Sequence, residues 1–285
     1  MNTELPGRTI RPATRAALER WFAGEGRRLG SGDTLLFYVT DHGTRGKEGP
    51  RDNRISLWGK EESLSVDELD GLLSQLDPGV RVVALMSQCF SGGFGLLAAG
   101  EEGTLPERDL CGFYSSTPDR PAYGCYAEVR DDDDVGHSIR FIEALAAGRS
   151  FEQSHRHVLV ADHTPDVPLR SSDFFLRERL EQAAKAQGLP PERYVDDLLA
   201  VAWRDRQAHE ADVRLLDRIG QAYGFASPRS LEELEKRLEQ LPPVGDVVSE
   251  HADAWGKTRD DVARANLRRF LAALAWWRCR GRYGR

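Results

Sequence analysis

Residues 80–93 read Val80-Arg81-Val82-Val83-Ala84-Leu85-Met86-Ser87-Gln88-Cys89-Phe90-Ser91-Gly92-Gly93. A short apolar and β-branched run ends at two polar residues, a cysteine and, three positions later, a pair of glycines. An uninterrupted apolar run of this length is typical of a strand buried on both faces of a parallel sheet. The stretch therefore predicts a central strand that carries Cys89 at its carboxyl end.

A second strand of the same kind is predicted over residues 34–40 and is followed by Asp41-His42-Gly43, 47 positions before Cys89. Between the two strands, Ser65 and Glu68 form a capping-box pattern that predicts the start of a helix running to about residue 76. Strand, helix and strand in this order favour two neighbouring parallel strands joined by a right-handed crossover. Their carboxyl ends would meet at one crevice, so we expect His42 and Cys89 to lie close together.

A cysteine and a histidine held close together are the residue types of a nucleophilic catalytic site. A thiol attacks a carbonyl group as the thiolate, and a nearby imidazole and a helix N-terminus both lower its pKa. A helix is expected over residues 92–99, directly behind Cys89. The backbone N–H groups of Gly43 and Cys89 are the candidate donors to an oxyanion. Alone, Cys89 would be interpreted as a buried structural thiol and His42 as a loop residue, but together with their glycines they favour catalysis.

The two strand ends resemble those of the caspase-like cysteine peptidases, the group of caspases, metacaspases, legumains and gingipains. In caspases the histidine likewise precedes the cysteine by about 50 residues. Residues 37–43 are most similar in style to the legumain histidine strand, and Cys89-Phe90-Ser91-Gly92 is similar to that family's Cys-Glu-Ser-Gly. Residues 112–124 resemble the strand and loop that follow. The resemblance covers about residues 12–173.

The resemblance implies a cysteine endopeptidase with no cofactor and no metal site, with Cys89 as the nucleophile and His42 as general base and acid. Some members of the group need calcium, and the sequence has no dedicated calcium loop, so calcium dependence stays open. Gly43 and Cys89 would form the oxyanion site, and Asp41 would tune or position the histidine. Position alone assigns the first substrate pocket to a polar set: Ser87, Gln88, Ser115, Ser116 and Asp119.

The chain also departs from its relatives beside the cysteine. Legumains carry a glutamate where Ser87 stands, and metacaspases carry an acidic residue where Gln88 stands. Neither cleavage preference is therefore transferred. Asp119, or the acidic run over residues 131–134, would favour a basic substrate side chain, although a charge run is more typical of a solvated loop.

The predicted fold is an α/β domain over residues 12–173, with a caspase-like, mostly parallel sheet flanked by helices, followed by an all-α domain over residues 174–285. The proline-spaced segment 164–170 is the predicted seam. Relatives have a strand, a helix and a strand before the unit seen here, so the sheet is expected to be abbreviated, with one open edge. A fragment, a shortened gene product, a processed precursor or a partner that covers the edge would each explain this.

Composition sets the remaining expectations. The net charge of −7 argues against nucleic acid as the default partner. Residues 259–278 predict a packed helix with an arginine face, with an interface, nucleic acid or an anionic surface as alternatives. No window reaches the ~18 apolar residues of a membrane span. Four cysteines without CxxC spacing indicate a reducing compartment such as the cytoplasm, and they are Cys89, Cys111, Cys125 and Cys279.

A second function class competes with the peptidase. The α/β unit would then be a catalytically silent scaffold that binds a partner protein through its sheet edge or through the helical half. The incomplete sheet and the missing pocket acid favour this reading. The intact His42-Gly43 and Gln88-Cys89-x-x-Gly92 elements favour a peptidase with a protein or peptide substrate.

Overall fold

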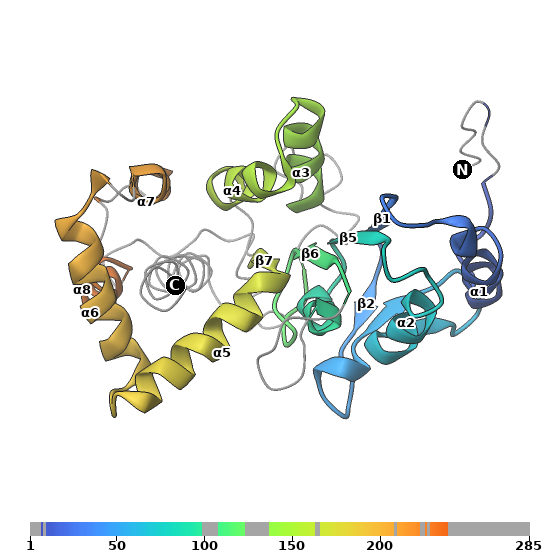
Figure 1. The fold of residues 1–285 in the computed structure, drawn as a ribbon, viewed down its shortest axis with the longest axis horizontal. Coiled ribbons are helices and arrows are strands. Elements are labelled where there is room, and N and C mark those ends of the chain that lie inside the picture. Colours follow the sequence, from blue (N-terminus) through green and yellow to red (C-terminus); the bar gives the residue numbers. More distant parts are fainter. Residues whose placement is uncertain are drawn as a thin grey trace, which may run out of the picture.

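A four-stranded sheet in the order β1-β5-β6-β7 lies at the centre of the protein (Figure 1). The computed structural model describes residues 7, 10–98, 108–122, 137–162, 166–207, 210–222, 226 and 229–238. The strands are β1 (Thr34–Val39), β5 (Arg81–Met86), β6 (Leu110–Tyr114) and β7 (Leu169–Arg170). β1, β5 and β6 run parallel, and β7 pairs antiparallel with β6. The predicted α/β class with a mostly parallel sheet is confirmed.

The register of β1 against β5 fixes the geometry of their carboxyl ends. Val39 is paired with Met86, and the Ser87 N–H donates to the Val39 carbonyl at 2.9 Å. His42 follows Val39 by three residues, and Cys89 follows Met86 by three residues. The two predicted reactive residues therefore leave neighbouring strands at the same level of the sheet.

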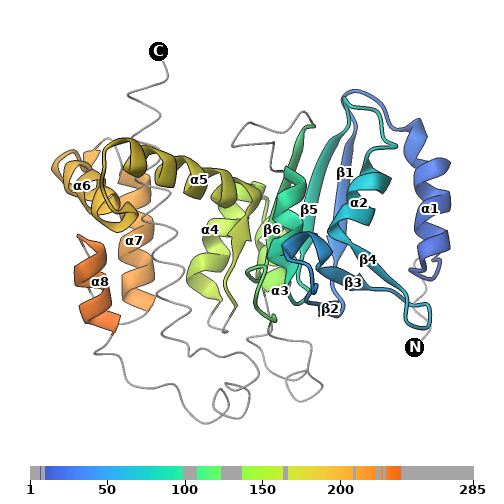
Figure 2. The same cartoon turned by 90° about the horizontal axis from the view of Figure 1, so that it is seen from below.

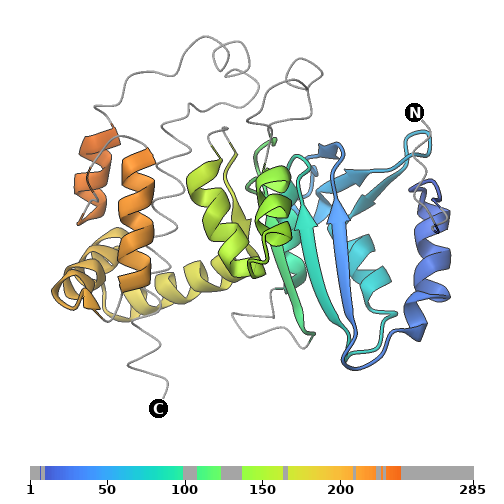
Figure 3. The same cartoon turned by 90° about the horizontal axis from the view of Figure 1, so that it is seen from above.

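Strand β5 is buried on both faces, as its unbroken apolar pattern predicts. Val82, Ala84 and Met86 join one core cluster, whereas Val83 and Leu85 join another. The first cluster lies under α1 (Arg15–Ala23), α2 (Val66–Leu73) and the 3-10 helix η3 (Ser91–Ala98) (Figure 2). The second lies under α3 (His137–Ala146) and α4 (Phe151–Ala161) (Figure 3). This alternation places one layer of helices on each face of the sheet.

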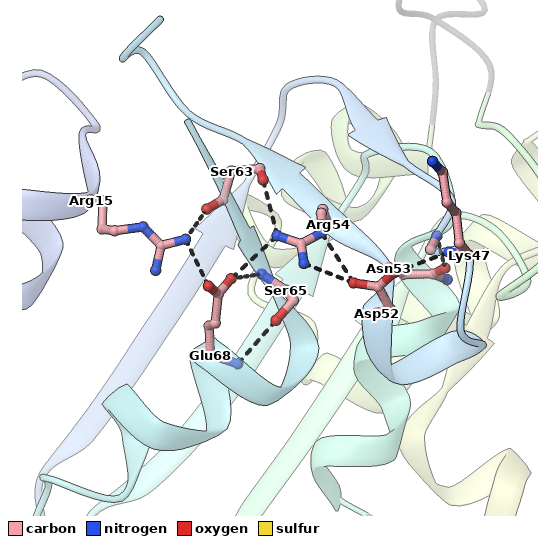
Figure 4. A network of polar contacts seen from close by, with 9 residues as sticks. Arg15, Lys47, Asp52, Asn53, Arg54, Ser63, Ser65 and Glu68 are labelled. Carbon is pink, nitrogen blue, oxygen red and sulfur yellow. Dashed lines mark hydrogen bonds and ion pairs between the residues drawn. The ribbon is translucent and has the colours of Figure 1, made fainter. Parts of the chain in front are cut away.

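A small antiparallel sheet follows the end of β1 and consists of β2 (Gly43–Thr44), β3 (Arg54–Ser56) and β4 (Ser63–Ser65). Residues 54–59 alternate in a pattern that predicts one arm of a small hairpin, and β3 forms that arm against β4. The predicted capping box is also present, because the Ser65 Oγ accepts from the Glu68 N–H at 3.2 Å and a Glu68 carboxylate oxygen accepts from the Ser65 N–H at 2.7 Å. Arg15 of α1 binds Glu68 of α2 at 2.9 Å and also donates to the Ser63 carbonyl of β4, so it joins α1 to α2 and to this sheet (Figure 4).

Four described helices follow β7, namely α5 (Ser171–Ala186), α6 (Pro191–Arg204), α7 (Glu210–Ala222) and α8 (Leu231–Leu238). The first turn of α5 still packs on the sheet, since the Gly112 N–H donates to the Ser171 Oγ at 3.1 Å. Further along, α5 contacts α6, and α6 contacts α8. A separate domain over residues 174–285 stays a prediction. The helix predicted over residues 259–278 and the acidic run 131–134 lie outside the described residues.

Several elements differ from their predicted form. Apolar residues near a helical period between Ala13 and about Leu29 predict one helix, but α1 ends at Ala23, where the chain bends at Gly24 and continues as the short 3-10 helix η1 (Gly26–Arg28). The helix expected over residues 92–99 is the 3-10 helix η3. Residues 111–117 are predicted to form the third strand, and the observed strand β6 instead begins at Leu110 and stops at Tyr114. Strand β7 lies in the segment expected only to be extended, since its pairing depends on β6, which is distant in sequence.

None of the helices in the described part of the chain is long and apolar enough to cross a membrane.

Candidate functional site

The candidate site lies where the chain leaves β1 and β5. Gly43, in β2, lies directly against the backbone of Cys89: a Cβ atom built on Gly43 would collide with the Cys89 carbonyl oxygen and would lie 2.9 Å from the Gln88 Cγ. A side chain at position 43 would therefore push the two strand ends apart. The glycine after the histidine is required by this close approach, and the predicted meeting of the two segments is present in the backbone.

The N–H group of Gly43 points away from β3. The Ser56 N–H donates to the His42 carbonyl at 2.9 Å, so residues 42 and 56 form a hydrogen-bonded pair of the antiparallel ladder. Gly43 and Ile55 are the next pair. Since such pairs alternate, the Gly43–Ile55 pair is of the other kind, whose N–H and carbonyl groups point away from the partner strand. This orientation leaves the Gly43 N–H outside the small sheet, as an oxyanion donor requires.

The thiol of Cys89 is half-buried and contacts the loop that follows β6. The Ala122 N–H donates to the Cys89 Sγ at 3.3 Å, and the Ala122 carbonyl lies 3.8 Å from the same sulfur. The N–H donor stabilises a thiolate, whereas the more distant carbonyl can accept only from the protonated thiol. Cys111, the other cysteine among the described residues, lies in β6, where burial raises the pKa of its thiol. The two thiols therefore occupy contrasting environments.

The imidazole of His42 is exposed, and within the described residues it makes no hydrogen bond or ion pair. Its backbone is held by two bonds, from the Ser56 N–H to its carbonyl and from its own N–H to the Asp41 carboxylate at 2.7 Å. The backbone thus brings His42 beside Cys89 without a bond between imidazole and sulfur. Catalytic hydrogen bonds are commonly long in unliganded enzymes and tighten when substrate binds.

The chain turns sharply directly after Cys89. The Ser91 N–H donates to the Gln88 carbonyl at 3.2 Å, which makes residues 88–91 a tight turn, and Phe90 has a φ of 60°. Glycine or asparagine is the usual residue with positive φ at the third position of such a turn, and a bulky side chain there is strained. Strained backbone held in place by its surroundings is concentrated at functional sites.

Serine hydroxyls and glycines fix the segment after this turn. The Ser91 Oγ lies 3.3 Å from both the Ser115 and the Ser116 hydroxyls, and it accepts from the Ser116 N–H at 3.2 Å. All three serines are buried. A Cβ atom at Gly92 would lie 2.5 Å from the Ser116 carbonyl oxygen, so Gly92 makes the close approach of η3 and the segment after β6 possible. The predicted glycines are therefore needed for packing around Cys89.

The residues predicted to line the substrate pocket lie in different environments. Ser115, Ser116 and Gln88 are buried, and the Gln88 Nε2 lies 3.8 Å from the Met86 sulfur. The Ser87 Oγ and the Gln88 Oε1 are buried without a hydrogen-bond partner in the described part of the chain. Asp119 is exposed and accepts from the Thr117 hydroxyl at 2.6 Å. A role of these five residues in substrate binding stays a prediction.

Sequence reasoning missed Asn53 and Ala122. Asn53 stands in a segment rich in turn formers, where an asparagine is ordinarily a solvated loop residue, yet it is 1% exposed. Ala122 carries no chemical signal in its side chain, because its contribution is a backbone N–H. No group of three or more His, Cys, Asp or Glu side chains that could hold a metal ion occurs among the described residues.

Comparison with known proteins identifies no family. No family model matches the chain, and no curated protein matches it. A crystal structure of a Geobacter sulfurreducens protein is similar over 55% of this chain and 72% of its own length, with 17% sequence identity and a TM-score of 0.41.

Proposed function

We propose that the protein is a caspase-like cysteine endopeptidase with a Cys89–His42 dyad. The observation that carries the proposal is the β1–β5 register, which brings His42-Gly43 and Cys89 to the same level of two adjacent parallel strands, with Gly43 against the Cys89 backbone. The carboxyl ends of parallel strands are where α/β sheets place their active sites. The strained turn at Phe90 and the N–H donor to the thiol add independent support.

The reaction would proceed by two acyl transfers. His42 takes the proton of the Cys89 thiol, and the sulfur attacks the carbonyl carbon of the scissile peptide. The N–H groups of Gly43 and Cys89 stabilise the oxyanion of the tetrahedral intermediate. Its collapse breaks the C–N bond, His42 gives its proton to the leaving amine, and a thioester remains on Cys89. Water, deprotonated by His42, then attacks the thioester, which releases the carboxylic acid and returns the proton to the thiol.

The remaining parts of the proposal concern the setting of this reaction. Residues 12–173 would form the catalytic domain, and residues 174–285 would form a helical domain that binds a partner or presents the substrate. The substrate is a protein or peptide. A reducing compartment such as the cytoplasm would keep Cys89 as a thiol.

A silent scaffold is the second candidate, and one observation favours it. β1 is the outermost strand of the sheet, and no described strand pairs with its outer edge. Leu36 and Tyr38 on β1 are 49% and 42% exposed. An uncharged edge strand with exposed apolar side chains is a pairing site for another polypeptide. This surface would serve a scaffold directly, although an enzyme can also carry it.

The test is cleavage of a peptide library by the wild-type chain, Cys89→Ala and the matched control Cys111→Ala, with and without calcium. The proposal predicts that Cys89→Ala abolishes hydrolysis with a nearly unchanged thermal midpoint, and that Cys111→Ala retains it. Hydrolysis that persists in Cys89→Ala would exclude the proposed nucleophile, and a wild-type chain that cleaves nothing would favour the scaffold.

A further inference from the structure

Asn53 is a buried side chain that joins three loops around Cys89. Its Oδ1 accepts from the Gly46 N–H at 3.0 Å, in the loop that follows His42. Its Nδ2 donates to the Phe90 carbonyl at 3.1 Å, one residue after Cys89, and to the Pro118 carbonyl at 2.8 Å, in the loop after β6. One amide therefore uses its acceptor and both donors on three segments that are distant in sequence.

Two of these bonds restrain the turn that presents the thiol. Phe90 has a positive φ, which costs free energy for a bulky residue unless the surroundings fix it. The Nδ2 bond fixes the carbonyl of this residue. On its other side, the Phe90 N–H donates to the Arg120 carbonyl at 2.8 Å, in the loop that Asn53 holds through Pro118.

The same loop supplies the contact to the sulfur. Pro118 is followed in this loop by Arg120, which binds the Phe90 N–H, and by Ala122, whose N–H donates to the Cys89 Sγ at 3.3 Å. Fixing the Pro118 carbonyl therefore fixes the segment that favours the thiolate. Gly93 leaves the space that Asn53 occupies, since a Cβ atom at position 93 would collide with the Asn53 amide.

Only an amide side chain of this size fits the arrangement. An aspartate would place carboxylate oxygens against the Phe90 and Pro118 carbonyls and would remove both donors. An alanine would leave two buried carbonyls and the Gly46 N–H without their partner. Both substitutions thus break the two bonds that Nδ2 donates, and only alanine also breaks the bond from the Gly46 N–H.

We infer that Asn53 is the positioning residue of the nucleophile: it holds the Cys89 turn and the Ala122 N–H in the geometry that the thiolate requires. As a contribution to catalysis this inference rests on the proposed peptidase function. Its effect on the reactivity of Cys89 does not, because thiol alkylation can be measured whether or not the chain cleaves peptides.

The test compares Asn53→Ala and Asn53→Asp with Ser150→Ala. Ser150 caps α4 through a bond from the Gln153 N–H at 3.2 Å, so its loss destabilises the fold away from Cys89. For each variant we would measure the thermal midpoint, kcat and KM on a cleaved library peptide, and the pH dependence of Cys89 alkylation by iodoacetamide, located by mass spectrometry.

Asn53→Ala should lower kcat by about 10–100-fold with KM changed by less than about threefold, because misplaced catalytic groups chiefly lose rate. The pH at which Cys89 is half-alkylated should rise by about half a unit or more, since the thiolate loses a fixed donor. Ser150→Ala should change neither quantity. Phe90→Gly introduced into Asn53→Ala should restore part of kcat and of the alkylation rate, because glycine adopts the positive φ readily.

An alkylation profile in Asn53→Ala that matches wild type and Ser150→Ala would overturn the inference and leave Asn53 a structural residue. If Asn53→Ala does not fold, the nearly isosteric Asn53→Asp provides the same comparison. A wild-type chain without peptidase activity would contradict the proposed function alone, and the alkylation profiles would still decide the role of Asn53.

Discussion

The ends of β1 and β5 carry the two reactive residues, yet the structure holds them very differently. Beyond β5, the turn over residues 88–91 is fixed by Asn53, by the carbonyl of Arg120 and by the buried serine cluster of Ser91, Ser115 and Ser116. Beyond β1, His42 is exposed, and its imidazole makes no polar contact within the described residues. The turn that carries the Cys89 thiol is fixed by buried hydrogen bonds between uncharged groups. The His42 imidazole is held only through hydrogen bonds of its own backbone, as far as the described residues show.

This difference suits the separate roles that the two residues would have in the proposed enzyme. A nucleophile must be held at a fixed position and orientation. The strained turn at Phe90 costs free energy and persists only where neighbouring groups fix it. A general base and acid has to face first the thiol and then the leaving amine. An exposed imidazole at the end of β1 can take its working position when substrate binds, so we expect substrate to order His42 more than Cys89.

The largest loss of activity is expected when the imidazole of His42 is removed. His42→Ala should lower kcat/KM by about 10²–10⁴-fold, the usual contribution of a general base. Its free energy of unfolding should change by less than about 0.5 kcal/mol, because the side chain is exposed. Asp41→Ala is the matched control and should cost less than about tenfold in rate, since the Asp41 carboxylate lies against the backbone of His42, whose N–H donates to it. A His42→Ala variant with full activity would exclude the proposed Cys89–His42 dyad.

Gly43→Ala tests the contact that joins the two ends. Its Cβ would collide with the Cys89 carbonyl, so the strand ends must separate. We expect about a 10²-fold loss of kcat, as a shift of about 1 Å at a reactive centre produces, with a detectable loss of stability. Gly71→Ala in α2 is the control, because a Cβ there meets no atom within 4 Å, and it should stabilise the protein slightly. Equal activity in both variants would show that the contact is unnecessary.

The effect of Ser91→Ala on the free energy of unfolding tests whether the serine cluster fixes the turn that follows Cys89. The change removes the shared partner of the Ser115 and Ser116 hydroxyls and of the Ser116 N–H. Buried groups left without a partner cost about 1–3 kcal/mol, which urea unfolding would measure. Ser74→Ala, at an exposed hydroxyl that donates to the Asp70 carbonyl, should cost less than about 0.5 kcal/mol. A loss no larger than that of Ser74→Ala would show that the serine cluster does not fix the turn.

The smallest expected effect is the pH dependence of the loop that contains Asp52. The hydrogen bond from Arg54, followed by the Lys47 N–H, lowers the pKa of Asp52 in the loop after β2 (Figure 4). Asp52 therefore contributes stability above the ordinary aspartate pKa of about 3.9, and this contribution is lost as pH falls through its lower folded-state pKa. The protection of the Lys47 amide against hydrogen exchange, relative to its intrinsic rate at each pH, should fall below about pH 4, before that of Phe90 and Ser91. In Asp52→Asn this pH dependence should disappear, and its persistence would assign it to another group.

The sequence predicts the backbone of the site better than its side-chain surroundings. The runs 34–40 and 80–86 are apolar and β-branched, so their strands, their parallel pairing and the position of Cys89 follow from local pattern and from crossover rules. The Ser65–Glu68 capping box is equally local and is confirmed. The glycines at 43, 92 and 93 are visible in the sequence, but which backbones they approach depends on the assembled fold.

Other features depend on contacts between distant segments and have no local signal. Asn53 is bonded to residues 37 and 65 positions away, and the Ala122 N–H meets a sulfur 33 positions away. The predicted pocket residues Ser115 and Ser116 are buried because Ser91 lies opposite them, a pairing that their own sequence does not reveal. The two residues of β7 lack any strand pattern for the same reason, since they are defined as a strand by their pairing with the distant β6.

The most direct test of the Cys89–His42 dyad is a comparison of two thiols in one chain. The protein would be treated at pH 7 with a peptide that carries a thiol-reactive electrophile, and mass spectrometry would follow the modification of Cys89 and Cys111. The dyad predicts that Cys89 reacts at least about 100-fold faster than Cys111, whose pKa burial raises, and that His42→Ala removes most of this advantage. Equal rates at the two thiols, or a fast reaction at Cys89 that is unchanged in His42→Ala, would contradict it.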